Sequence, residues 1–198
     1  ENIGIEGRAV SPFGLFHYED EPLKNLKRSE KFYRDKFYRK EYPITVTNNR
    51  KTHIGYFSAD FKNHPVMHLS APLFELHDKS NFEIYLYSFV EKEDEFTERA
   101  KKSGCVFRNI NKLNDIEVVE LARKDQIDIA VDLMGYTGYS RFSIFSYKVA
   151  PIQINYLGYP GSLGTDKIDY IIADEIVIPN GHEKFYTEKI IRMPNCYL

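Results

Sequence analysis

Residues 53–76, HIGYFSADFKNHPVMHLSAPLFEL, place a short apolar run, a polar loop and an amphipathic stretch in direct succession. The run His53–Ser58 is rich in bulky apolar and aromatic residues, which predicts a strand. Pro65 suits the first turn of a helix, and apolar side chains then recur at helical spacing, which predicts a helix over Val66–Leu76. A strand that leads through one loop into a helix is the repeating unit of a parallel α/β sheet.

The same alternation continues along the rest of the sequence. Further strands are predicted at Phe82–Phe89, Val106–Asn109, Ile127–Asp132, Ile152–Tyr156, Tyr170–Ala173 and Lys189–Arg192. Helices are predicted between them at Glu93–Ser103, Ile116–Lys124 and Tyr139–Phe145. We therefore expect an α/β fold with a Rossmann-like parallel sheet covered by helices on both faces, in a lobe that spans residues 51–198.

A charged and aromatic segment precedes this lobe. From Glu21 to Lys40, apolar side chains recur at spacings that form a stripe on a helix, which Pro22 would start and Pro43 would end. The polar turn Thr47–Lys51 follows. We expect residues 1–50 to form a helical bracket that packs against the lobe.

Composition argues against several classes of function. The chain has 27 Lys and Arg against 29 Asp and Glu, so no general field attracts nucleic acid or an anionic membrane. Its apolar runs are far shorter than the roughly 20 residues of a membrane-spanning helix, and its first residues lack a signal-peptide pattern. Cys105 and Cys196 form neither a CxxC pair nor a metal motif with histidine. We expect a cytoplasmic protein with no metal and no cofactor, and with neither nucleic acid nor membrane as a partner.

Ligands of doubly wound sheets bind beyond the carboxyl ends of the strands, so the loops after the predicted strands are the candidate sites. The loop after the first strand contains Asp60, Asn63 and His64, and His68 follows it. Asn63 or Asp60 could cap the next helix, leaving free backbone N–H groups for a phosphate or a sugar oxygen. The alternative is that these residues are only caps and that both imidazoles are structural.

Glycine-rich loops follow two later strands. Residues 132–141, DLMGYTGYSR, offer the hydroxyl of Thr137 and the guanidinium of Arg141, although an ordinary strand-to-helix turn explains them as well. Residues 157–165, LGYPGSLGT, contain three glycines that allow the backbone to approach a ligand closely. Their spacing is neither GxGxxG nor GxxxxGK[ST], which disfavours Rossmann dehydrogenases and P-loop nucleoside triphosphatases. The sequence also lacks the GxSxG and HExxH motifs of hydrolases.

Several of these segments, in this order and at these intervals, resemble one known family. They are GYFSADF (55–61), NHP (63–65), GYT (135–137), APIQ (150–153) and LGYPG (157–161). The chain resembles the N-terminal catalytic lobe of the O-linked N-acetylglucosamine transferase and SPINDLY family, glycosyltransferase family 41. The resemblance implies one lobe of a two-lobed GT-B enzyme. It also implies inverting, metal-independent transfer of N-acetylglucosamine from UDP-N-acetylglucosamine to Ser or Thr hydroxyls of proteins.

The resemblance further implies roles for individual residues. His64 is expected to contact the donor sugar or the acceptor hydroxyl, and Asp60 to orient it or to relay its proton. These two are the expected catalytic residues. The expected substrate-binding residues are Asn63, Pro65, His68, Thr137, Leu157, Gly158, Tyr159, Pro160 and Gly161.

Two departures from the family pattern affect this interpretation. Where animal members carry His-Pro-His-His ahead of the lobe, this chain reads Ser11-Pro12-Phe13-Gly14, so Phe13 replaces a candidate catalytic histidine. Val66 stands where a hydroxyl side chain is expected. Two alternatives therefore stay open, namely a SPINDLY-like O-fucosyltransferase that uses GDP-fucose and a non-catalytic lobe that binds a protein.

In this family, most nucleotide contacts and a lysine that neutralises the leaving diphosphate come from a C-terminal lobe, which would follow Leu198. In enzymes of this family, the corresponding helical bracket joins the lobe to tetratricopeptide repeats. The expected partners are a sugar nucleotide, an acceptor protein or peptide, and the C-terminal lobe. We expect the 198-residue chain alone to be inactive, because half of the cleft would be missing.

Overall fold

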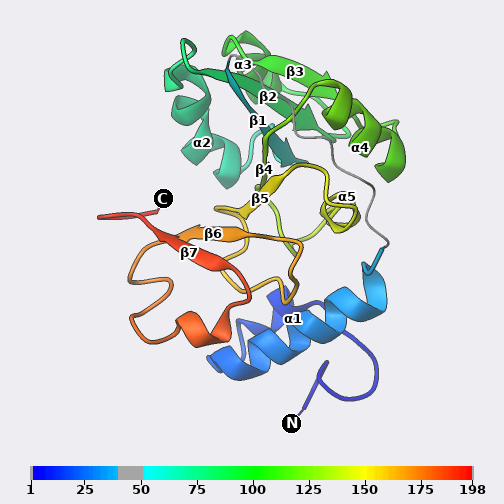
Figure 1. The fold of residues 1–198 in the computed structure, drawn as a ribbon, viewed down its shortest axis with the longest axis vertical. Helices are drawn as coiled ribbons and strands as arrows, with labels where there is room; N and C mark the ends of the chain where they lie inside the picture. Colours follow the sequence, from blue (N-terminus) through cyan, green and yellow to red (C-terminus); the bar gives the residue numbers. More distant parts are fainter. Residues whose placement is uncertain (1, 40–50, 198) are drawn as a thin grey trace.

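Over residues 2–39 and 51–197, which the computed structural model describes, the chain builds a sheet of seven strands (Figure 1). They are β1 (Thr52–Ser58), β2 (Phe82–Ser88), β3 (Val106–Asn109), β4 (Ile129–Asp132), β5 (Ile152–Asn155), β6 (Tyr170–Ala173) and β7 (Lys189–Arg192). All neighbours are parallel, in the order β3-β2-β1-β4-β5-β6-β7. The strand order reverses between β1 and β4, which is the switch point of a doubly wound sheet. The predicted α/β class and Rossmann-like sheet are confirmed.

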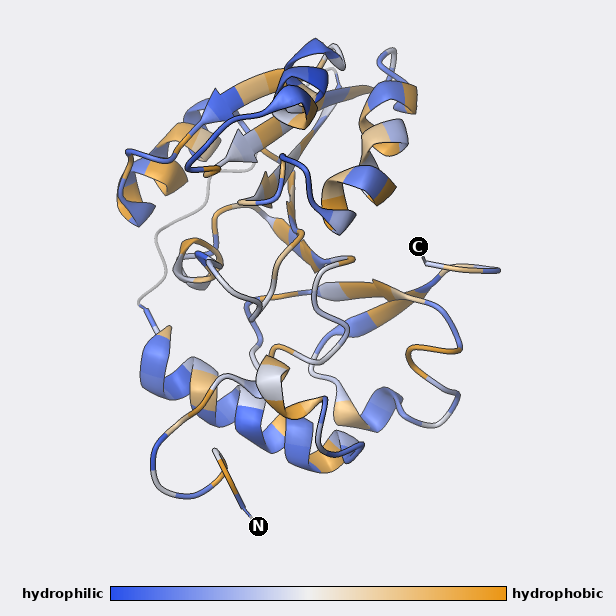
Figure 2. Cartoon of the chain, turned by 180° about the vertical axis from the view of Figure 1, so that it is seen from behind, coloured by the Kyte–Doolittle hydropathy of each residue, from blue (hydrophilic) through white to orange (hydrophobic). Residues whose placement is uncertain are grey.

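Helices precede the first strand or lie between later strands, and they cover both faces of the sheet. They are α1 (Pro22–Lys36), α2 (Pro65–Leu76), α3 (Glu95–Lys102), α4 (Asp115–Lys124) and α5 (Ser143–Ser146), with short 3-10 turns η1 (Pro12–Leu15) and η2 (Glu183–Phe185). In Figure 2 the helices carry hydrophilic and hydrophobic stretches side by side, as expected for elements that bury one face. Among the described residues, no helix combines the length and the apolar character that crossing a bilayer requires.

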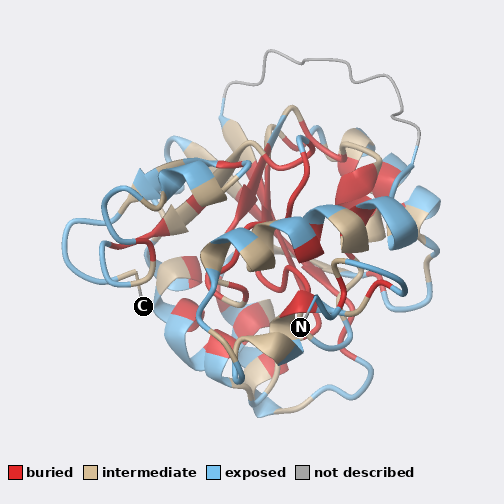
Figure 3. Cartoon of the chain, turned by 90° about the horizontal axis from the view of Figure 1, so that it is seen from below, coloured by how far each residue is buried: buried red, intermediate tan, exposed pale blue. Residues whose placement is uncertain are grey.

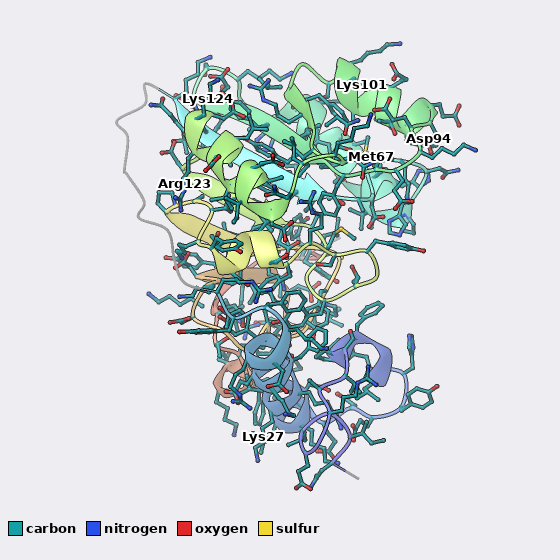
Figure 4. The ribbon with its side chains drawn as sticks, turned by 90° about the vertical axis from the view of Figure 1, so that its right-hand side faces the viewer. Lys27, Met67, Asp94, Lys101, Arg123 and Lys124 are labelled. Carbon is teal, nitrogen blue, oxygen red and sulfur yellow. The ribbon has the colours of Figure 1, made fainter. Side chains whose placement is uncertain are left out.

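The two largest apolar cores lie on opposite faces of the sheet, because successive side chains of a strand point to opposite faces. Along β1, Tyr56 faces α2 and its ring lies 5.2 Å from that of Phe74. Phe57 faces the other side, 5.3 Å from the ring of Phe145 in α5. Met67, labelled on α2 in Figure 4, is fully buried in the first of these cores.

The helix α1 packs across the second core. Tyr33 is buried there, and the rings of Phe32 and Phe37 lie 5.1 Å and 5.7 Å from that of Tyr136. Seen from below in Figure 3, α1 crosses in front of the buried strands. The helix α1 thus packs against the sheet through its aromatic side chains.

The ends of two predicted helices differ from those of the structure. The helix predicted up to Lys40 is wrong at its end, because α1 stops at Lys36 and Phe37 (φ −120°) is its C-terminal cap. Pro43 and residues 47–50 lie outside the described residues, so most of the polar turn and the division after residue 50 stay predictions. The helix predicted at Tyr139–Phe145 is wrong at its start, because α5 begins at Ser143. The φ of Tyr139 is 62°, and this left-handed conformation cannot continue into a right-handed helix.

Candidate functional site

Three loops meet at the carboxyl ends of β1, β4 and β5 and enclose a pocket of about 350 Å³, which we call the switch-point pocket. It lies where the strand order reverses, the usual ligand crevice of this sheet type. Its walls come from the three loops and from η1. The lining residues are Phe13, Asp60, Lys62, His64, Val66, Leu133, Thr137, Gly138, Tyr139 and Gly158.

His64 forms the N-terminal cap of α2. Its backbone is extended, and its Nδ1 accepts a hydrogen bond from the backbone N–H of Val66 at 3.3 Å. Pro65 occupies the first helical position, where no N–H is needed. The prediction that Asn63 or Asp60 caps this helix is therefore wrong, since the imidazole fills that position itself.

Asp60 lies beside this imidazole. Its Oδ2 is 3.6 Å from Nδ1 of His64, and the side chains are 13% and 40% exposed, respectively. Burial raises the pKa of Asp60, and the neighbouring His64 and Lys62 oppose that rise. The carboxylate favours a proton on Nδ1 of His64, whereas the cap bond requires Nδ1 without a proton. His64 can thus either expose a basic Nε2 or carry a proton there.

Asn63 and His68 are joined to each other outside the switch-point pocket. The Oδ1 atom of Asn63 is 2.9 Å from Nε2 of His68, whose ring packs on that of Phe96 at 4.5 Å. The backbone N–H of Asn63 donates to Asp94, the cap of α3 that Figure 4 labels, at 2.7 Å. Together with Pro65, these predicted substrate residues lie outside the lining of the pocket, and they connect α2 to α3.

The loop after β4 contributes Thr137 to the pocket. Its Oγ1 donates to the carbonyl of Met134 at 2.9 Å, which fixes the turn. Arg141 does not have the free guanidinium that a phosphate site needs. It donates to Asp115 at 2.6 Å and to two backbone carbonyls between β3 and α4.

The predicted site residues of the loop after β5 do not all lie in the switch-point pocket. Gly158 lines the switch-point pocket, whereas Leu157 and Tyr159 are 8% and 1% exposed and belong to the two cores. Pro160 and Gly161 line another pocket, between α1 and the segment around η2. Of the residues predicted to form the sugar-binding wall in this loop, Gly158 is the one that lines the switch-point pocket.

Glycines allow the second and third loops to touch through their backbones. A Cβ on Gly158 would lie 2.1 Å from the carbonyl oxygen of Leu133, closer than any real contact. Gly135 has φ 55°, and a Cβ there would lie 2.5 Å from that of Tyr159. Side chains at either position would push the loops apart and open the pocket.

Sequence reasoning did not select Lys62, Leu133, Gly138 or Tyr139 as site residues. The sequence predicts their loops, but which side of a loop faces a pocket depends on contacts with distant segments. Phe13 was noted only as a departure from the family pattern. Its ring lies in the pocket wall, 6.2 Å from that of Tyr159.

Asp132 ends β4 directly beneath these loops. Its Oδ1 accepts from the N–H of Met134 at 2.9 Å, whereas its buried Oδ2 has no partner among the described residues. Burial raises its pKa to about 6, against the opposing N–H groups of Met134 and Gly135. Asn155, its neighbour on β5, also has a buried Oδ1 without a partner in residues 2–39 and 51–197.

We expect Asp132→Asn to stabilise the protein at neutral pH. Because the folded pKa of about 6 exceeds the ordinary value of 3.8, the fold prefers the neutral carboxyl, and stability falls as the pH rises through this interval. The amide removes that penalty, up to about 3 kcal/mol above pH 6. Urea unfolding at several pH values measures the difference between variant and wild type, which should shrink toward pH 4. The exposed Asp166→Asn serves as control, and a variant that is less stable at neutral pH would contradict the argument.

Comparison with known proteins identifies the family of the chain. A profile of glycosyl transferase family 41 matches residues 29–198. The Arabidopsis thaliana protein named probable UDP-N-acetylglucosamine–peptide N-acetylglucosaminyltransferase SEC is 34% identical over 149 residues, covering 75% of this chain and 15% of that protein. The A. thaliana protein of the same description named SPINDLY is 32% identical over 163 residues, covering 80% of this chain and 17% of that protein.

A solved structure supports the same assignment. A mutant of the Thermobaculum terrenum O-GlcNAc transferase matches with a TM-score of 0.85 and 30% identity, covering 94% of this chain and 37% of that chain. The chain thus spans a minor part of the length of its relatives, with the fold of one lobe. The match over most of its residues shows that this chain belongs to glycosyltransferase family 41.

Proposed function

We propose that this chain is the N-terminal catalytic lobe of an enzyme that transfers N-acetylglucosamine from UDP-N-acetylglucosamine to Ser or Thr hydroxyls of proteins. The supporting observation is the switch-point pocket, in which three loops surround the pair of Asp60 and His64. The names of the two Arabidopsis relatives describe transfer of N-acetylglucosamine from UDP-N-acetylglucosamine to a peptide, which supports the proposal. We propose a single displacement that inverts the anomeric carbon and uses no metal, as the family resemblance implies.

In this reaction the acceptor oxygen attacks the anomeric carbon while the bond to the diphosphate breaks and the hydroxyl loses its proton. His64 can accept that proton at Nε2 when its Nδ1–H faces Asp60, 3.6 Å away. The carboxylate of Asp60 then stabilises the imidazolium. With 40% of its side chain exposed, His64 is open to an incoming substrate.

Part of the lining of the pocket is apolar. Phe13, Val66 and Leu133 line it, a surface that suits the acetamido methyl and the apolar face of a sugar ring. Lys62 is a cation of this lobe that could meet the developing diphosphate charge. We propose that further cations come from a C-terminal lobe that closes the pocket from the other side, and that the enzyme works in the cytoplasm.

The test is sugar transfer to protein acceptors by the full-length protein, from UDP-N-acetylglucosamine and separately from GDP-fucose. We expect transfer from the former, with an inverted linkage and with activity retained in a chelator. The 198-residue chain alone is the control in which no transfer is expected. Transfer from GDP-fucose alone would favour the SPINDLY-like alternative. Transfer from neither donor, with a protein partner bound, would favour a non-catalytic lobe.

A further inference from the structure

Tyr139 has an unusual combination of backbone strain and exposure. Its φ of 62° is a conformation that favours glycine, and the residue is 85% exposed. Two other non-glycine residues at positive φ have compensating contacts, since Leu157 packs in a core and Lys148 pairs with Asp169 at 2.7 Å. Among the described residues, the ring and hydroxyl of Tyr139 have no hydrogen bond or ring contact. The fold holds this ring in solvent without a stabilising contact of its own.

The backbone on both sides of the ring is fixed. Thr137 is bonded to the carbonyl of Met134, and the hydroxyl of Ser140 donates to the carbonyl of Gly135. Arg141, the next residue, is bound to Asp115. The exposed ring is therefore presented by a rigid turn. Strained residues that the surrounding structure holds in place cluster at active sites and ligand clamps.

Tyr139 also separates two pockets. It lines the switch-point pocket and a second pocket of about 390 Å³, which we call the side pocket. Lys62 also lines both pockets. The buried Ala59 and Phe89 contribute apolar surface to the side pocket. The remaining residues that line it are Glu91, Asn111, Ser140 and Arg141.

The charges of the side pocket do not favour a diphosphate. The guanidinium of Arg141 is neutralised by Asp115 at 2.6 Å, and the carboxylate of Glu91 offsets the charge of Lys62. A mixed apolar and polar pocket suits a peptide side chain, with polar groups at its rim for the backbone amides of an extended segment. An exposed aromatic ring between two pockets can support the backbone that runs from one to the other.

We propose that Tyr139 is the platform on which the acceptor polypeptide lies. The hydroxyl residue to be modified enters the switch-point pocket beside His64, and a neighbouring side chain of the same segment enters the side pocket. Tyr139 is thus a specificity-determining residue. The inference rests on the proposed function, in which a protein accepts the sugar. It adds the surface of the lobe on which that protein binds.

The test uses Tyr139→Gly in the full-length protein, because glycine relieves the backbone strain while it removes the ring. Binding is measured with a fluorescent peptide library that has a fixed central serine and random neighbours, in the presence of UDP. We expect affinity to fall about tenfold and the preference for particular neighbours to weaken. Tyr139→Phe should retain binding. Gln126→Gly, which relieves the same kind of backbone conformation (φ 56°) at the opposite end of β4, should also retain binding.

A second readout separates this inference from the proposed function. In Tyr139→Gly, the rate of UDP-N-acetylglucosamine hydrolysis, which needs no peptide, should fall by a much smaller factor than the affinity for the peptide. If wild type and Tyr139→Gly bind peptides with equal affinity and selectivity, the proposal that Tyr139 supports the acceptor is wrong. If the rate of hydrolysis and the peptide affinity fall by the same factor, the proposal is also wrong, because Tyr139 would then maintain the pocket as a whole. Peptide binding that depends on Tyr139 in a protein that transfers no sugar would instead refute only the proposed function.

Discussion

Replacing His64 by alanine is expected to lower kcat/KM for transfer from UDP-N-acetylglucosamine by about 10²- to 10⁴-fold, the usual contribution of a positioned general base. The reason is geometric, because His64 lines the switch-point pocket and is paired with Asp60. The measurement is transfer to a peptide acceptor by the full-length protein at several pH values.

Two further variants separate the chemistry of His64 from its structural position. Asparagine is a good N-terminal cap but not a base, so His64→Asn should keep the start of α2 while losing as much activity as alanine. His68→Ala changes a histidine of the same helix that is bound to Asn63 and lies outside the lining of the pocket, and it should leave transfer nearly unchanged. An active His64→Asn enzyme would show that the cap, and not the base, is what the site requires.

Gly158→Ala is expected to destabilise the protein by about 1–3 kcal/mol and to remove most of the transfer activity. The added methyl would lie 2.1 Å from the carbonyl oxygen of Leu133, a backbone atom that cannot turn aside. The loops after β4 and β5 must then separate, which changes the pocket between them. Urea unfolding and a transfer assay on the same preparation measure the two effects.

The matched control for this change is Gly138→Ala. Gly138 also lines the switch-point pocket, but a Cβ there would meet nothing within 4 Å. Its stability should therefore stay close to that of the wild type. If Gly158→Ala were as stable as Gly138→Ala, the close contact with Leu133 would not be a real constraint on the loops.

The strands could be predicted closely from the sequence because their signal is local. The runs Val106–Asn109, Tyr170–Ala173 and Lys189–Arg192 coincide with β3, β6 and β7, and β4 starts two residues later than predicted, at Ile129. In a parallel sheet covered on both faces, an apolar run between polar loops is sufficient to mark a strand. The same reasoning located the loops that surround the pocket.

The sequence could not predict which side chains of those loops point into the pocket and which are buried in a core. Leu157, Gly158 and Tyr159 are consecutive, yet the first and last are buried in opposite cores and the middle one faces the pocket. That division depends on the contact with Leu133, a residue from another loop. His64 shows the same limit, because its capping bond could be recognised only once its backbone conformation was known.

The close packing of α1 has a consequence for the order of events during synthesis. A Cβ on Gly164 would lie 2.3 Å from the backbone nitrogen of Glu30, so this helix and the loop after β5 are in intimate contact. The helix leaves the ribosome well before that loop exists, and Tyr33 and Phe32 then have no core to enter. Completion of the lobe must wait for its later strands, and in that interval the aromatic face of the nascent helix is exposed and prone to aggregate.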